Sequence, residues 1–91
     1  MPFFHRRFLM AASVATLRKW LKTAKEQQAT HLIVVRDIFD QEDRPVFVLK
    51  EEDPHQAFKE ADSPRMKRVK HVFNVSMDWD EQLKLGTCRQ F

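Results

Sequence analysis

Residues 32–35 read Leu-Ile-Val-Val, within a β-prone stretch that extends over 30–39. Successive side chains of a strand point to opposite faces, so this run would place apolar side chains on both faces of its strand. The sequence Val-Phe-Val-Leu at 46–49 repeats the pattern in a second β-prone stretch, 44–50. Strands that are apolar on both faces are covered on both faces. The chain is therefore expected to bury a sheet between two layers.

Two helices are predicted around these strands. Residues 13–28 place apolar side chains at helical spacing on one face, and Ser13 is a suitable N-cap. Residues 54–61 are predicted to form a shorter helix, because Asp53 can cap it and Pro54 suits its first position. The first helix would precede the two strands in the chain, and the second would follow them.

The stretches at 30–39, 44–50 and 66–76 are the predicted strands, and one helical turn is predicted within 78–86. The order helix-strand-strand-helix-strand indicates an α+β domain with a meander-like, three-stranded antiparallel sheet. The first helix can cover one face of the sheet. Because the second helix is short, we expect a homo-oligomer, or an apolar N-terminal arm, to complete the burial of the other face.

Length and composition restrict the class of protein. The 91 residues predict a single domain, placed at 13–91, and the 43% of hydrophobic residues are typical of a globular chain. Cys88 is the single cysteine, which excludes an intrachain disulfide and suits a reducing cytoplasm. No apolar run approaches the roughly 18 residues that span a bilayer, so no membrane association is expected. The net charge of +3 is thin support for a nucleic-acid partner.

Residues 1–12 are interpreted as a leader or arm without fixed structure. Arg6 and Arg7 precede an apolar run at 8–15, which is the order found in a signal peptide. A signal peptide has a longer apolar region and ends in a small-residue cleavage site, so secretion is disfavoured. Two alternatives stay open: translation from Met10, or an arm whose phenylalanines cover apolar surface elsewhere.

The loop between the first two strands carries Asp37, Asp40, Glu42 and Asp43. A calcium loop of the EF-hand kind needs alternate oxygen ligands, a glycine and a distal glutamate, and this loop lacks that spacing. A catalytic carboxylate pair needs a sheltered site that separates the two pKa values, whereas hairpin tips are solvated. We favour a polar turn that also discourages edge pairing. A functional role for at least one of the acids is the alternative.

Metal and nucleophilic chemistry have little support in the sequence. The four histidines lack the spacing of a metal pair, and a single glycine rules out a phosphate-cradling glycine loop. His31 and His71 fall on strands that can be neighbours, and by alternation they can share a face. No base stands near Cys88 in the sequence, which a nucleophile would need. We therefore expect no catalytic residue, no metal and no cofactor.

The basic segment at 64–71, Pro-Arg-Met-Lys-Arg-Val-Lys-His, is the best candidate for a binding surface. On a regular strand, Arg68 and Lys70 share one face, while Lys67 and His71 point the other way. Such a row can bind a phosphate or a nucleotide. An equally supported alternative is a basic edge strand whose charges prevent aggregation. Aromatic residues, which accompany cations in single-strand nucleic-acid sites, are sparse around this segment.

The motif at 29–48, together with the strand at 66–76, resembles a family of short, largely uncharacterised bacterial and phage proteins. The shared pattern is Ala-Thr-His before a strand, an acidic D-x-F-D-x-x-D loop, and a Pro-Val-aromatic-Val strand. The resemblance covers residues 17–80, and Arg44 stands where an aromatic residue is more usual. Some short phage proteins sequester nucleotide immune signals, and by analogy the resemblance implies an anti-defence role of this type.

Together, these patterns predict a non-enzymatic, cytoplasmic, oligomeric protein that binds a small anionic ligand, nucleotide-derived and of the cyclic-nucleotide kind. Basic side chains would contact the ligand, and the loop acids would orient ribose hydroxyls or those basic side chains. The residues expected at the site are His31, Arg36, Asp37, Asp40, Asp43, Arg68, Lys70 and His71. The alternative is a protein-interaction module or inhibitor without a small-molecule ligand.

Overall fold

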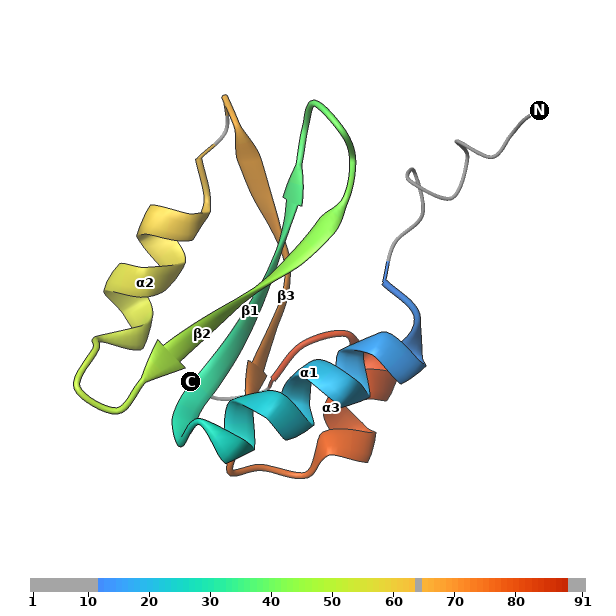
Figure 1. Ribbon diagram of the computed structural model, residues 1–91, viewed down its shortest axis with the longest axis vertical. Coiled ribbons are helices and arrows are strands. Elements are labelled where there is room, and N and C mark those ends of the chain that lie inside the picture. Colours follow the sequence, from blue (N-terminus) through green and yellow to red (C-terminus); the bar gives the residue numbers. More distant parts are fainter. Residues whose placement is uncertain (1–11, 64, 89–91) are drawn as a thin grey trace.

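The computed structural model describes residues 12–63 and 65–88 (Figure 1). The elements in chain order are α1 (Val14–Glu26), β1 (Ala29–Asp37), β2 (Asp43–Leu49), α2 (Pro54–Ala61), β3 (Lys67–Asn74) and α3 (Trp79–Leu85). The predicted α+β fold with a three-stranded antiparallel sheet is confirmed. The predicted helical turn near the end of the chain is a helix of seven residues, capped by Asp78 and ended by Gly86. Of the predicted leader or arm at 1–12, residues 1–11 lie outside the described residues, and Ala12 is described.

Strand β1 lies in the centre of the sheet, between β2 and β3. The predicted meander-like order is wrong, because a meander would place β2 in the centre. The burial of the strands explains the observed order: all five residues from His31 to Val35 are buried, whereas β2 is mostly half-buried. Pro45 cannot donate a backbone hydrogen bond, and its place in an edge strand agrees with that restriction.

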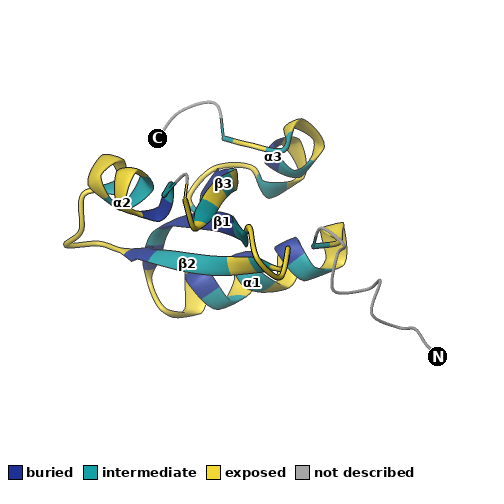
Figure 2. Ribbon diagram, turned by 90° about the horizontal axis from the view of Figure 1, so that it is seen from above, coloured by how far each residue is buried: buried dark blue, intermediate teal, exposed yellow. Residues whose placement is uncertain are grey.

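Helices cover both faces of the sheet, and Figure 2 shows α1 and α2 on opposite sides of β2. The side of the sheet toward α1 and α3 is built around Leu17, Leu21, Leu32, Val34 and Phe73. The side toward α2 is built around Ile33, Val35, Val48, Ala61 and Val72. Helix α2 therefore covers the face of the sheet that an oligomer or an N-terminal arm was expected to cover. The oligomer itself stays a prediction.

A β-bulge in β3 changes which side chains share a face. Val34 of β1 pairs with His71 and Val35 pairs with Val69, so Lys70 is an extra residue. An extra residue reverses the alternation beyond it. Arg68 and His71 consequently both lie on the α1 side, and the expectation that His71 faces away from Arg68 is wrong.

The edge of β3 that does not face β1 is occupied by other parts of the chain. The backbone of Asn74 accepts a hydrogen bond from the Gln82 side chain (2.9 Å) and donates one to it (2.7 Å). The N–H of Val69 donates to Asp62 Oδ1, and the C=O of Val72 accepts from the N–H of Cys88. These contacts satisfy backbone groups that would otherwise recruit another strand. Within the described ranges, the chain forms no helix with the length and apolar character needed to cross a membrane.

Candidate functional site

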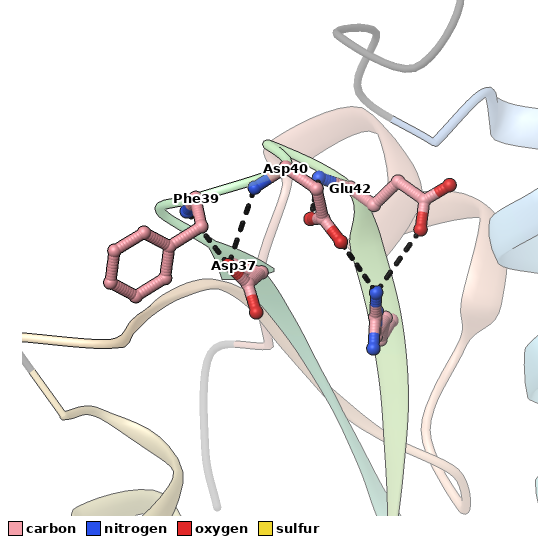
Figure 3. Close-up of polar contacts among 5 residues, drawn as sticks. Asp37, Phe39, Asp40 and Glu42 are labelled. Atoms are coloured by element: carbon pink, nitrogen blue, oxygen red, sulfur yellow. Dashed lines mark hydrogen bonds and ion pairs between the residues drawn. The ribbon is translucent and has the colours of Figure 1, made fainter.

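Three of the four loop acids organise the turn at the tip of the β1–β2 hairpin (Figure 3). Asp37 Oδ1 accepts hydrogen bonds from the N–H groups of Phe39 (2.7 Å) and Asp40 (3.4 Å). Asp40 and Glu42 form ion pairs with the Arg44 guanidinium at 2.6 and 3.2 Å. Backbone capping and charge pairing of this kind are what the favoured interpretation, a polar turn, requires.

Asp43 differs from the other loop acids because its side chain is buried, with 2% of its surface exposed. Its carboxylate accepts a hydrogen bond from Arg36 Nε at 2.8 Å and one from the N–H of Ala12, also at 2.8 Å. The first contact fixes the Arg36 guanidinium in position. The second attaches Ala12, which lies two residues before the start of α1, to the hairpin. Asp43 therefore joins the loop, β1 and the start of α1.

A basic hollow lies on the α1 side of the sheet, next to the hairpin tip. It has a volume of about 300 Å³, is open to solvent, and is lined by Arg36, Ile38, Gln41, Arg68 and Lys70. Arg36 of β1 lies directly opposite Arg68 of β3 in the register of the sheet. Lys70, the extra residue of the bulge, is the third cation. We use the name basic hollow for these five residues.

The electrostatics of the basic hollow are only partly balanced. Like charges directly opposite each other across two strands are destabilising. Asp43 compensates Arg36, and Asp62 Oδ1 lies 3.4 Å from Arg68 Nε in a pair whose arginine is exposed and whose carboxylate is half-buried. Exposed ion pairs contribute little. Among the residues that the structure describes, two carboxylates form ion pairs with these three cations, and an anion between Arg36 and Arg68 would relieve their repulsion.

The two candidate histidines do not lie at the basic hollow, and they do not share a face. His31 pairs with Val48 and Asn74, which places it on the α2 side, where it is buried beside the Thr30 hydroxyl (2.9 Å). His71 faces the α1 side, donates from Nδ1 to the C=O of Gly86 (2.8 Å) and stacks on Phe73. The suggested cross-strand pair is therefore wrong, because the register places His31 opposite Asn74 and not opposite His71.

The structure thus brings together Arg36, Arg68 and Lys70, with Asp43 behind Arg36, and separates them from His31, Asp37 and Asp40. Sequence reasoning missed two further lining residues, Ile38 and Gln41. Both belong to the hairpin loop. The loop reaches β3 only because β1 is the central strand, and no local pattern in the sequence reports that pairing.

Cys88, the only cysteine, packs against the α2 side of the sheet. Burial raises the pKa of its thiol, and two hydrogen bonds, from its own backbone and from Thr87, oppose that shift. A raised pKa leaves less thiolate, the nucleophilic form, at neutral pH. In residues 12–63 and 65–88, no three histidine, cysteine, aspartate or glutamate side chains gather closely enough to hold a metal ion.

We expect native Cys88 to be alkylated by iodoacetamide more slowly than the same cysteine in urea-unfolded protein near neutral pH. The pH midpoint of the alkylation rate should lie higher in the native protein, because burial disfavours the thiolate. Mass spectrometry of quenched samples across a pH series measures both midpoints. A native midpoint at or below that of the unfolded chain would contradict the prediction and reopen a nucleophilic role for Cys88.

Comparison of the chain with family models, with curated proteins and with solved structures found no match. The resemblance to short bacterial and phage proteins therefore stays a prediction.

Proposed function

We propose that this protein binds a small phosphate-bearing ligand, nucleotide-derived, in the basic hollow and holds it without converting it. The observation that carries the proposal is the direct opposition of Arg36 and Arg68 on neighbouring strands, with Lys70 beside them. Guanidinium groups bind phosphate oxygens through paired, charge-assisted hydrogen bonds. A bound phosphate would also supply the negative charge that the hollow lacks.

Several features suit a small ligand. The volume of about 300 Å³ is at the lower end of the range for small-molecule sites. Asp43 holds the Arg36 side chain in place, which lowers the entropy that binding would cost. Ile38 and Gln41 add an apolar surface and an amide at the rim, which can contact the remainder of the ligand.

Sequestration is the biological form of this proposal. A protein that captures a nucleotide signal, such as a cyclic nucleotide, needs a binding site and no catalytic group. The resemblance to short phage proteins implies such an anti-defence role, in which each protomer of a homo-oligomer would hold one ligand.

We expect Arg68→Ala and Lys70→Ala each to weaken ligand binding by about tenfold, because each removes a charged hydrogen-bond donor worth about 1.5 kcal/mol. Native mass spectrometry with a pool of cyclic and linear nucleotides identifies the ligand and the assembly, and calorimetry then measures the affinity. Lys22→Ala, which removes an exposed lysine from α1, is the matched control and should bind as the wild type does.

Two results would count against the proposal. One is a protein that takes up none of the nucleotides in the pool. The other is binding that Arg68→Ala and Lys70→Ala leave unchanged, which would place the ligand elsewhere. Either result would favour the alternative function, a protein-interaction module. The exposed apolar side chains of Ile38 and Phe39 at the hairpin tip are the observation that supports this alternative.

A further inference from the structure

The end of the sheet next to the basic hollow carries an exposed apolar patch. Ile38, Phe39 and Met66 have 41%, 75% and 51% of their surfaces exposed. The N–H of Ile38 donates to the C=O of Met66 at 3.0 Å, which joins the hairpin tip to the segment before β3. Figure 1 shows the hairpin tip and the start of β3 extending past α1 and α2. We call the surface formed by the apolar residues Ile38, Phe39 and Met66 and the cations Arg65, Arg68 and Lys70 the distal surface.

Cations surround the apolar patch on the β3 side. Arg68 and Lys70 line the basic hollow, and Arg65 precedes Met66 in the chain, whereas Lys67 faces the α2 side of the sheet, opposite Asp37. Two acids of the hairpin loop, Asp40 and Glu42, are compensated by Arg44. A third, Asp37, lies opposite Lys67 in the register of the sheet. Figure 3 shows the Phe39 ring turned away from Asp40 and Glu42. The exposed aromatic ring of Phe39 thus projects from the loop that meets the start of the basic strand through Ile38 and Met66, although aromatic residues are sparse around these cations in the sequence.

We infer that the distal surface binds single-stranded nucleic acid, with a base stacked on Phe39 and phosphates at Arg65, Arg68 and Lys70. The inference rests on the proposed phosphate site and extends its ligand from a single nucleotide to a nucleic-acid strand. An aromatic platform combined with a positively charged track is the arrangement by which proteins bind single strands without sequence preference.

The geometry supports one continuous surface. Ile38 lines the basic hollow, and Phe39 is the next residue, with its Cα about 3.8 Å further along the chain. A nucleotide whose phosphate occupies the hollow would therefore have its neighbouring base within reach of the ring. The Asp37 carboxylate fixes the backbone N–H of Phe39, so the ring projects from an ordered turn.

An anionic membrane surface fits the distal surface less well. Asp37 and Asp40 lie two residues before and one residue after Phe39. Insertion of the ring into a leaflet would carry both carboxylates to a negatively charged surface, which is unfavourable. A nucleic-acid strand that approaches from the β3 side would place its phosphates on the cations and only a base on the ring.

Fluorescence anisotropy with a labelled oligothymidylate of about 12 nucleotides, within the size range of single-strand sites, tests the inference. We expect Phe39→Ala to weaken binding of the oligonucleotide by about tenfold, the loss typical of one stacked base. Met77→Ala removes an exposed apolar side chain from the loop after β3 and should leave binding unchanged. Arg68→Ala should reduce the slope of log affinity against log salt by about 0.7.

A parallel titration with a thymidine monophosphate separates this inference from the proposed function. If Phe39→Ala weakens binding of the oligonucleotide and leaves binding of the monophosphate unchanged, the inference is supported. Monophosphate binding without oligonucleotide binding would overturn the inference and leave the proposed function standing, whereas failure of the oligonucleotide and of every nucleotide in the pool would overturn both. The protein could instead fail to bind the oligonucleotide and co-sediment with phosphatidylserine vesicles. If Phe39→Ala abolished that co-sedimentation, the distal surface would be assigned to membranes.

Discussion

Replacing Asp43 with alanine is expected to lower the free energy of unfolding by about 2–3 kcal/mol. The substitution removes a buried carboxylate and leaves Arg36 and the N–H of Ala12 without their acceptor. Breaking a buried ion pair from one side costs about 3–5 kcal/mol. The expected loss is smaller here because the Arg36 side chain is partly exposed and can regain water. In a domain of this size the loss corresponds to a melting temperature lower by roughly 10–20 °C, which urea or thermal unfolding followed by circular dichroism would measure.

Asp40→Ala is the matched control, because it removes an acid from the same loop. Its ion pair with Arg44 is exposed on both sides, and such pairs contribute about 1 kcal/mol or less. The double variant Asp43→Leu with Arg36→Met should be more stable than Asp43→Ala, since no unpaired charge remains. Equal destabilisation by Asp43→Ala and Asp40→Ala would show that Asp43 has no special structural role.

The helices and strands could be predicted from the sequence because their signals are local. The helix predicted at 13–28 is α1 (Val14–Glu26), and Asp53 with Pro54 marks the start of α2. Strand order depends on long-range pairing, and here the prediction failed. A signal for the order was present, since the apolar run at 32–35 suits a strand with neighbours on both sides.

The candidate site was predictable as a set of residues and not as an arrangement. Arg36, Arg68 and Lys70 were expected to bind an anion, and they do line one hollow. The bulge at Lys70 could not be read from the sequence, because nothing in a basic, alternating segment marks an extra residue. That single residue places His71 on the α1 side, and the register separates it from His31.

The roles of the loop acids also depended on contacts that sequence cannot report. Asp37, Asp40 and Asp43 have the same side chain and lie within seven residues. Two of them organise the turn, and the third is buried against Arg36. The difference arises because Asp43 lies opposite Arg36 in the register of the hairpin, on the side toward α1.

Gln82→Ala is the second substitution with a large expected effect, about 3 kcal/mol in the free energy of unfolding. Only 2% of the surface of Gln82 is exposed. Its side-chain amide accepts from the N–H of Asn74 and donates to the carbonyl groups of Asn74 and Asp78. Alanine would remove the acceptor of the buried Asn74 N–H, at a cost of about 1–3 kcal/mol. The carbonyl groups of Asn74 and Asp78 would keep the hydrogen bonds from the N–H groups of Met77 and Gln82, so each lost amide bond to them adds about 1 kcal/mol. Chemical unfolding measures the loss.

Gln56→Ala makes the same change on the exposed surface of α2 and should alter stability by less than about 0.5 kcal/mol. The loss of Gln82 should also leave the edge of β3 able to pair with another chain, because this amide occupies the backbone groups of Asn74 as a neighbouring strand would. We therefore expect Gln82→Ala to self-associate with rising concentration in sedimentation velocity, while Gln56→Ala retains the assembly state of the wild type. A variant that is destabilised without any change in association would show that Gln82 stabilises the fold alone and that Asp62 and the segment around Cys88 suffice to protect the edge.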